Sequence, residues 1–216
     1  PIATMGQHMD RNSAFSYRCN GCGQCCMNKS IQVNPYEIAR LSRNQGLSTG
    51  DFITSHMADD GPFLEKTSGG ACVFWGQEGC TVHKDRPLVC RLYPLGRVVT
   101  PDGEELFRTV EPHPDTKGDY GTNGNVDGFL KTQDAAIYVE AADRYHALFN
   151  DLLALVDIDD ASGGGPMVQD WLDLDELLSH TEVAETNDDL RDRMIAHIEI
   201  IRALAEYMRG DQQSNG

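Results

Sequence analysis

Four cysteines stand within eight residues near the start of the chain, and they constrain the fold more than any other feature. They are Cys19, Cys22, Cys25 and Cys26, in the pattern CxxCxxCC. Each Cys-x-x-Cys interval allows a tight turn to direct two sulfur atoms at one ion. Gly21 and Gly23 permit the backbone angles by which N–H groups turn toward charged sulfur. The run therefore predicts that this half of the chain folds around a metal or iron–sulfur centre.

The chain has 216 residues and seven cysteines, and the remaining three are Cys72, Cys80 and Cys90. A disulfide framework would leave one thiol over. The N-terminus shows no basic segment followed by an apolar stretch, so we do not expect a secretory signal. We predict a cytoplasmic protein with reduced thiolates, in which all seven cysteines are candidate metal ligands. Seven thiols exceed one four-ligand site, so either two metals share thiolates or some cysteines are structural.

The identity of the metal follows less directly from the spacing. Zinc and iron–sulfur clusters both accept four thiolates. The triple interval is similar to the run of bacterial ferredoxins. Because Cys26 follows Cys25 directly, the fourth ligand would be Cys26 or a distant residue such as Cys90. Zinc fingers usually combine two Cys-x-x-Cys knuckles, and no second knuckle follows here. The pattern favours a 4Fe–4S cluster, with zinc or iron ions as the alternative.

Basic residues gather around Cys90 in a chain that is otherwise acidic. The window contains one acid, Asp85, and the basic residues Lys84, Arg86, Arg91 and Arg97. Arginine side chains can offset the negative charge of thiolates around a metal and donate hydrogen bonds to sulfur. We predict that Arg86 and Arg91 contact the cofactor; the alternative is a solvated basic patch.

The overall charge restricts the partners. Acidic residues outnumber basic ones by 34 to 18, which gives a net charge of −16 and a pI of about 4.6. Such a surface repels nucleic-acid phosphates and anionic membranes. No apolar run approaches the roughly 18 residues that a membrane-spanning helix needs. We expect a protein or small-molecule partner, and neither nucleic acid nor a membrane.

Hydrophobic periodicity, capping residues and turn signals predict the secondary structure. A capping box at Asn34 and Glu37 predicts a helix that ends at Gly46, and Ser48 predicts the start of a second helix. Apolar residues at helical spacing predict a long helix at about 137–155. The other predicted elements are a loosely held stretch at 1–18, a short strand at 30–33, hairpins at 71–83 and 95–110, a linker at 162–166, a brief helix at 172–178 and a final helix at 187–210.

These elements predict an α+β fold. A small, irregular, cysteine-rich half with short β-hairpins around a metal centre precedes a helical C-terminal half. The predicted boundaries are 17–110 for the cysteine-cluster region, 111–128 for a long loop rich in Gly, Pro, Asn and Asp, and 129–210 for the helical region. Because neither half alone is rich in core residues, we expect the helices to pack on the first half in one compact domain.

Four motifs follow one another in the N-terminal half of the chain. They are the CxxCxxCC run, Ala71-Cys72-Val73-Phe74, Gly79-Cys80-Thr81-Val82-His83 and Arg86-Pro87-Leu88-Val89-Cys90-Arg91-Leu92-Tyr93-Pro94. In this order they resemble the CxxCxxCC cysteine-cluster family, of the YkgJ type, which is described as zinc- or iron-chelating. The resemblance covers about residues 17–97, with a weaker similarity in the region of Gln133, and implies that the cysteines bind metal.

Flagellin lysine N-methylases carry a similar cysteine domain, so the chain resembles them more weakly. The resemblance leaves the reaction open, and the sequence shows no independent S-adenosylmethionine-binding motif. Our first hypothesis is a cytosolic metal or iron–sulfur protein with a redox, sensing or catalytic role. The alternatives are a structural zinc module with an acidic partner-binding surface, and a relative of protein-lysine N-methylases.

Overall fold

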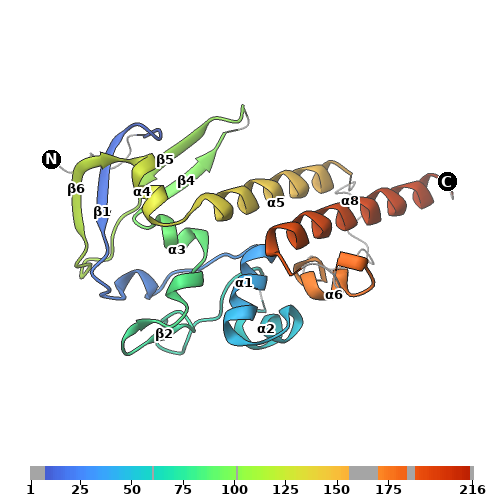
Figure 1. Cartoon of the computed structure of the whole chain (residues 1–216), viewed down its shortest axis with the longest axis horizontal. Coiled ribbons are helices and arrows are strands. Elements are labelled where there is room, and N and C mark those ends of the chain that lie inside the picture. Colours follow the sequence, from blue (N-terminus) through green and yellow to red (C-terminus); the bar gives the residue numbers. More distant parts are fainter. Residues whose placement is uncertain (1–7, 60, 101, 156–169, 184–187, 215–216) are drawn as a thin grey trace. The chain divides into compact units, whose positions relative to one another are not determined.

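The structure is a computed structural model that describes residues 8–59, 61–100, 102–155, 170–183 and 188–214 (Figure 1). The chain divides into two compact units. We call Pro1–Gln32 with Leu64–Ala136 the cysteine unit, and Val33–Phe63 with Ile137–Gly216 the helical unit. Helices and antiparallel strand pairs occur together, which confirms the predicted α+β class. Residues 33–63 group with the C-terminal helices, an assignment that the linear boundaries of the sequence analysis do not contain.

The described strands of the cysteine unit pair antiparallel. The pairs are β1 (Ala14–Arg18) with β6 (Asp119–Asn125), β2 (Trp75–Gly76) with β3 (Gly79–Cys80), and β4 (Leu95–Val99) with β5 (Glu105–Thr109). Both predicted hairpins, β2–β3 and β4–β5, are therefore confirmed. Gly79 and Gly103 lie at their turns with φ angles of 112° and 82°, which side chains disfavour and glycine accepts.

The β1–β6 pair corrects two predictions. The stretch 1–18 contains β1, and the predicted loop 111–128 contains β6 and the start of α4 (Val126–Thr132). Phe15 of β1 is buried, and its ring meets Phe129 of α4 edge to face with centroids 5.1 Å apart. The pairing joins segments that are distant in the sequence, so burial against a remote residue decides it and no local turn signal marks it (Figure 1).

Short helices link the strands of the cysteine unit. They are η1 (Gln24–Cys26), η2 (His83–Asp85), α3 (Leu88–Leu92) and α4. The side-chain oxygen of Asn125 accepts a hydrogen bond from the main-chain N–H of Gly128 at 2.8 Å and so caps α4. The cap turns the chain from β6 directly into the helix.

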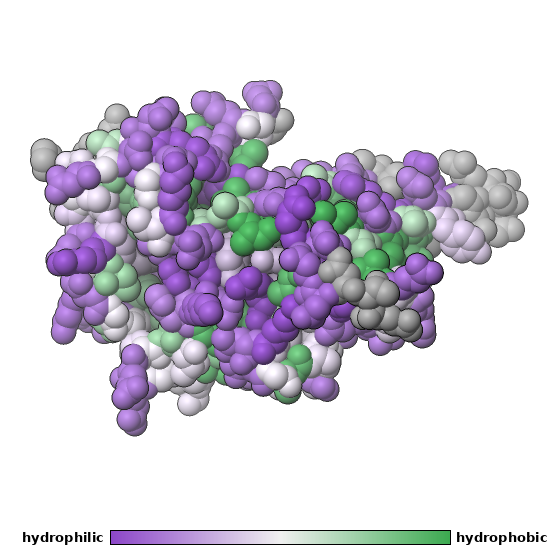
Figure 2. All heavy atoms as spheres, in the orientation of Figure 1, coloured by the Kyte–Doolittle hydropathy of each residue, from purple (hydrophilic) through white to green (hydrophobic). Residues whose placement is uncertain are grey.

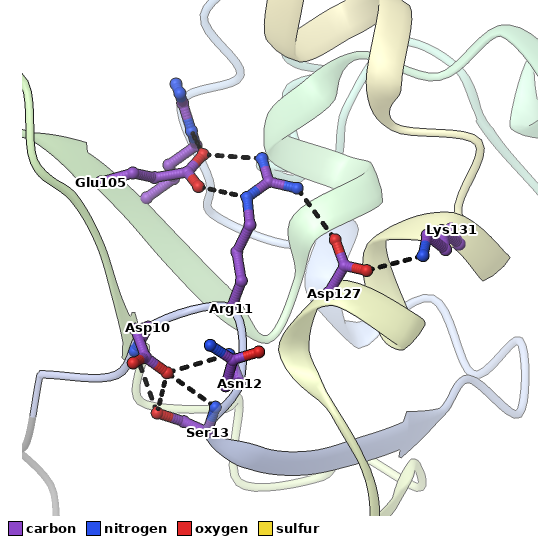
Figure 3. A network of polar contacts seen from close by, with 8 residues as sticks. Asp10, Arg11, Asn12, Ser13, Glu105, Asp127 and Lys131 are labelled. Atoms are coloured by element: carbon purple, nitrogen blue, oxygen red, sulfur yellow. Dashed lines mark hydrogen bonds and ion pairs between the residues drawn. The ribbon is translucent and has the colours of Figure 1, made fainter.

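An ion-pair network joins the N-terminal segment to β5 and α4 (Figure 3). Arg11 donates to both carboxylate oxygens of Glu105 and, at 3.2 Å, to Asp127. Arg97 donates to the same Glu105 carboxylate, and Lys131 pairs with Asp127. Burial raises the pKa of Glu105, but the hydrogen bonds from Arg11 and Arg97 outweigh it and lower that pKa below its ordinary value. The network therefore holds the segment before β1 against the β4–β5 hairpin.

The described part of the helical unit consists of helices. These are α1 (Pro35–Gln45), α2 (Thr49–His56), α5 (Ala136–Leu155), η3 (Asp170–Leu172), α6 (Leu174–Leu178) and α8 (Leu190–Ser214). The predicted capping box is confirmed, because Asn34 and Glu37 each accept a hydrogen bond from the other's main-chain N–H. Gly46 ends α1 with a φ of 68°, and Ser48 caps α2, as predicted.

Helices α5 and α8 lie side by side (Figure 1). The hydroxyl of Tyr145 on α5 meets Nδ1 of His197 on α8 at 3.0 Å, and Arg191 pairs with Glu140 at 2.8 Å. His197 is 0% exposed, and this burial lowers its pKa to about 4. The core therefore holds a neutral histidine at neutral pH.

Two further element predictions are wrong and one is untested. Residues 30–33 do not form a strand, although Ile31 and Val33 are buried. The final helix does not end at Gly210 but continues to Ser214, because a single glycine weakens a helix without necessarily ending it. The predicted linker 162–166 lies outside the described residues.

The face of the molecule in Figure 2 is mostly hydrophilic, with hydrophobic residues in small groups. Among the residues that the structure describes, none of the helices has the length and apolar character needed to cross a membrane.

Candidate metal centre

The vicinal cysteines Cys25 and Cys26 lie on the short turn η1. Gly23 precedes this turn with a φ of 73°, and its carbonyl accepts from the Cys26 N–H at 2.8 Å. The two Sγ atoms are 4.0 Å apart. Their hydrogen bond lowers the pKa of Cys25 to about 7 and raises the pKa of Cys26. Cys25 is therefore partly ionised at neutral pH, and the thiolate is the form that binds metal.

The ring of Trp75 rests on this turn. A Cβ atom built on Gly23 would lie 1.9 Å from the Trp75 indole. A Cβ atom on Gly21, whose φ is 66°, would meet nothing within 4 Å. Gly23 is therefore needed for its backbone angle and for the close approach of the ring, whereas Gly21 is needed for its angle alone.

Main-chain hydrogen bonds bring the β2–β3 hairpin to the same turn. The N–H of Cys72 donates to the carbonyl of Cys26 at 2.9 Å. The register of the hairpin places Trp75 opposite Cys80. Cys72 is buried and Cys80 is half-buried. The backbone therefore places Cys72, just before the hairpin, beside the two cysteines of η1, and Cys80 on the strand that pairs with β2.

Main-chain N–H groups are directed at several of the sulfur atoms. In three cases the donor stands two residues after its cysteine: Gly21 for Cys19, at 3.4 Å, Phe74 for Cys72, and Val82 for Cys80. Such bonds stabilise a thiolate and are among the means by which proteins tune metal–sulfur centres. The local backbone around these cysteines is thus suited to charged sulfur.

The thiols form one electrostatically connected group. Cys25 interacts with Cys72 and Cys80, and Cys26 interacts with Cys80 and Cys90. Burial raises the pKa of Cys72 and of Cys80, and neighbouring thiols raise both further. Gathered thiolates therefore repel one another, and a bound cation removes this repulsion. The donor set fits a thiophilic metal.

Cys19 and Cys22, at the start of the CxxCxxCC run, have surroundings different from those of Cys25 and Cys26. Cys19 is exposed. The Sγ atom of Cys22 accepts from the Lys117 N–H at 3.5 Å, and the Asn20 side chain donates to the Lys117 carbonyl at 2.5 Å. Among the described residues, no three Cys, His, Asp or Glu side chains are arranged to hold a metal ion. The structure gathers the thiols without closing them into a coordination site among the described residues.

The two predicted cofactor-binding arginines have different surroundings. Arg91 is 3% exposed and donates to the main-chain carbonyls of Lys84, Arg86 and Gln133. It therefore braces the main chain. Arg86 is half-buried, and its guanidinium interacts electrostatically with thiols. These thiols belong to Cys19, Cys80 and Cys90.

Two residues that contact this region were not named as site residues from the sequence. Lys117 reaches Cys22 through its main-chain N–H, and Gln133 accepts from Arg86 through its side-chain oxygen at 2.7 Å. Both stand in segments remote from the cysteine motifs. The capping residue Asn125 is the signal in the sequence that could have predicted α4, and a helix that starts there ends next to Gln133.

Comparison with known proteins agrees with this chemistry. Residues 18–113 match the model of the CxxCxxCC family, which is described as a putative zinc- or iron-chelating domain. The matched segment contains all seven cysteines. No curated protein and no solved structure matches the chain. The weaker resemblance to lysine N-methylases stays a prediction. Residues 18–113 of this chain are therefore similar to the CxxCxxCC family of putative zinc- or iron-chelating domains.

Proposed function

We propose that the cysteine unit holds a 4Fe–4S cluster, in preference to zinc or iron ions, in a redox or sensing role. The observation that carries the proposal is the gathering of thiols from three chain segments, with main-chain N–H groups directed at sulfur. The gathered thiols are Cys25, Cys26, Cys72, Cys80 and Cys90. Thiolate sulfur is the ligand that iron–sulfur clusters and zinc share.

The ligands of the centre would come from this group, with Cys19 and Cys22 as the remaining candidates. A cluster supplies one-electron transfer when it is bound. The protein's own residues supply the setting: Trp75 packs on the turn, and Arg86 offers positive charge to the sulfur atoms. The main-chain N–H donors would withdraw electron density from sulfur and so raise the reduction potential of a bound cluster.

A structural zinc site is the second candidate. Structural zinc sites are held by four protein ligands from fixed chain segments, and Cys72 is buried, with its main chain bonded to the turn that carries Cys26. In this case the acidic surface, with a net charge of −16, would serve a protein partner. Nucleic acid and membrane surfaces are not expected as partners for either candidate, because the charge repels both.

Metal and acid-labile sulfide analysis of anaerobically purified protein, with its electron paramagnetic resonance spectrum, separates the two candidates. A cluster requires about four iron atoms and four sulfide ions per chain and a paramagnetic state on reduction or oxidation. Stoichiometric zinc without sulfide supports the second candidate. Protein that binds neither metal in stoichiometric amount contradicts both.

Serine variants test the ligand assignment. We expect Cys25→Ser and Cys22→Ser to lose metal and to destabilise the cysteine unit, because thiolate–metal bonds contribute folding free energy. Metal content and urea unfolding of both variants provide the measurement. Unchanged metal content together with unchanged unfolding would show that the run does not hold the centre.

A further inference from the structure

Arginines of the cysteine unit differ in the charge of the groups that hold them. Arg11 and Arg18 pair with carboxylates. Arg86 donates instead to neutral acceptors, the carbonyl of His83 at 2.6 Å and the side-chain oxygen of Gln133 at 2.7 Å. A carboxylate cancels most of the field of a guanidinium, whereas an amide oxygen holds the group and leaves its charge in effect. In a chain with a net charge of −16, Arg86 therefore keeps a positive charge that can stabilise nearby anions.

Gln133 is oriented by the end of α4. The N–H of Ala135 donates to the Leu130 carbonyl at 3.2 Å, which closes the helix around Gln133. The main-chain carbonyl of Gln133 accepts from Arg91 at 2.7 Å. Its side-chain Nε2 donates to the hydroxyl of Thr132 at 3.1 Å. With the nitrogen engaged on that side, the oxygen is presented to Arg86.

Arg86 connects this amide to the thiols. The N–H of Cys90 donates to the carbonyl of Pro87 at 3.0 Å, which places Cys90 on the turn directly after Arg86, and the guanidinium lies within electrostatic range of Cys19, Cys80 and Cys90. The main chain that carries it is fixed as well, because Arg91 donates to the carbonyls of Lys84 and Arg86 at 2.5 and 2.9 Å. The hydrogen bonds of Arg86 and Arg91 therefore fix the position of the Arg86 guanidinium, and the neutral acceptors of Arg86 leave its charge uncancelled.

We propose that Gln133 is a positioning residue for the metal centre: its neutral amide oxygen holds the Arg86 guanidinium near the thiols without cancelling its charge. The inference rests on the proposed function, because the charge matters when thiolates bind a metal. A site of several thiolates around one metal is anionic, and a nearby positive charge stabilises it. Outer partners of metal ligands contribute about ten- to a hundredfold to metal affinity.

The substitution Gln133→Glu tests this directly, because it keeps the shape and the acceptor while adding a charge that cancels that of Arg86. Co²⁺ is titrated into the reduced full chain under anaerobic conditions in competition with a chelator. Urea unfolding of the metal-free protein is measured in parallel. We expect about tenfold weaker Co²⁺ binding with an unfolding midpoint that is unchanged or higher. A merely structural role for Gln133 predicts unchanged Co²⁺ affinity.

Matched variants complete the experiment. Arg86→Gln removes the guanidinium and should weaken Co²⁺ binding by about tenfold as well. Gln45→Glu makes the same charge change at an exposed position on α1, and Arg108→Gln removes a positive charge from an exposed position on β5. Both controls should stay within about twofold of the unmodified chain, because exposed charges are screened.

The outcomes separate this inference from the proposed function. Unchanged Co²⁺ affinity in Gln133→Glu overturns the role of Gln133, whatever Arg86→Gln does. An effect of the controls as large as that of Gln133→Glu also overturns it, since net charge alone would then explain the loss. An unmodified chain that binds neither Co²⁺ nor a reconstituted cluster overturns the proposed function itself.

Discussion

Replacing Gly23 by alanine tests whether the contact between the η1 turn and Trp75 supports the cysteine unit. Two costs add at this position. An alanine at a φ of 73° is in the left-handed region, which costs roughly 1–2 kcal/mol. Its methyl group would also lie 1.9 Å from the indole, and such overpacking costs about 1–3 kcal/mol. The free energy of unfolding should therefore fall by about 2–5 kcal/mol, a large part of the stability of an ordinary domain.

Gly21 offers a matched control on the same turn. Its φ is 66°, and a Cβ there would meet nothing within 4 Å, so Gly21→Ala should cost the backbone term of roughly 1–2 kcal/mol alone. The assay is urea unfolding of the reduced, metal-free protein, followed by far-ultraviolet circular dichroism. Co²⁺ affinity of each variant shows whether the displaced ring also disturbs the thiols.

The double variant with Trp75→Ala isolates the contact. Without the indole, Gly23→Ala should cost no more than Gly21→Ala, which gives a coupling free energy of about 1–3 kcal/mol. Equal costs of Gly23→Ala and Gly21→Ala in the unmodified chain would refute the reasoning. Strict additivity of Gly23→Ala and Trp75→Ala would refute it as well.

Three further predictions concern the stability of the two units. Burial holds the pKa of His197 at about 4, below its ordinary value of 6.5, so its stabilising effect is full above pH 6.5 and is lost as the pH falls to about 4. The free energy of unfolding should therefore fall by about 3 kcal/mol between pH 7 and pH 4, as measured by urea unfolding at both pH values. This fall should be smaller in His197→Gln and unchanged in the control His146→Gln, whose histidine is exposed. Asn34→Ala removes a capping box and should lower the unfolding free energy by about 1 kcal/mol, whereas an unchanged urea midpoint would show that the cap is dispensable. Because the hydrogen bonds of Glu105 lower its pKa, its contribution is present above its ordinary pKa and is lost below it. Glu105→Gln should therefore lose stability at pH 7 and show a flatter acid limb, and an acid limb as steep as that of the unmodified chain would contradict this.

Elements with local signals were predicted correctly. The capping box at Asn34, the left-handed end of α1 at Gly46 and the two hairpins agree with the structure. Each depends on residues a few positions apart, whose backbone preferences and hydrogen bonds are almost independent of the rest of the chain. The family of the cysteine region was predictable for a related reason, because ligand spacing is itself a local pattern.

Elements that depend on remote contacts were not predicted. The β1–β6 pair is stabilised by burial of Phe15 against Phe129, and β6 has a composition typical of a loop. The grouping of residues 33–63 with the C-terminal helices rests on apolar contacts such as those of Ala39 with Leu174 and Leu178. Neither depends on neighbouring residues in the sequence, so neither leaves a local signal.

The sequence by itself determined that this chain brings seven thiols, glycines that permit tight turns, and an acidic surface. Only the tertiary structure decided how these groups meet. It placed Cys72 beside the thiols of η1, and it gave two similar arginines different surroundings: Arg91 braces the main chain, whereas the guanidinium of Arg86 lies within electrostatic range of the sulfur atoms. The reason is that ligand chemistry belongs to residue types, whereas charge and burial depend on the distances that long-range packing sets.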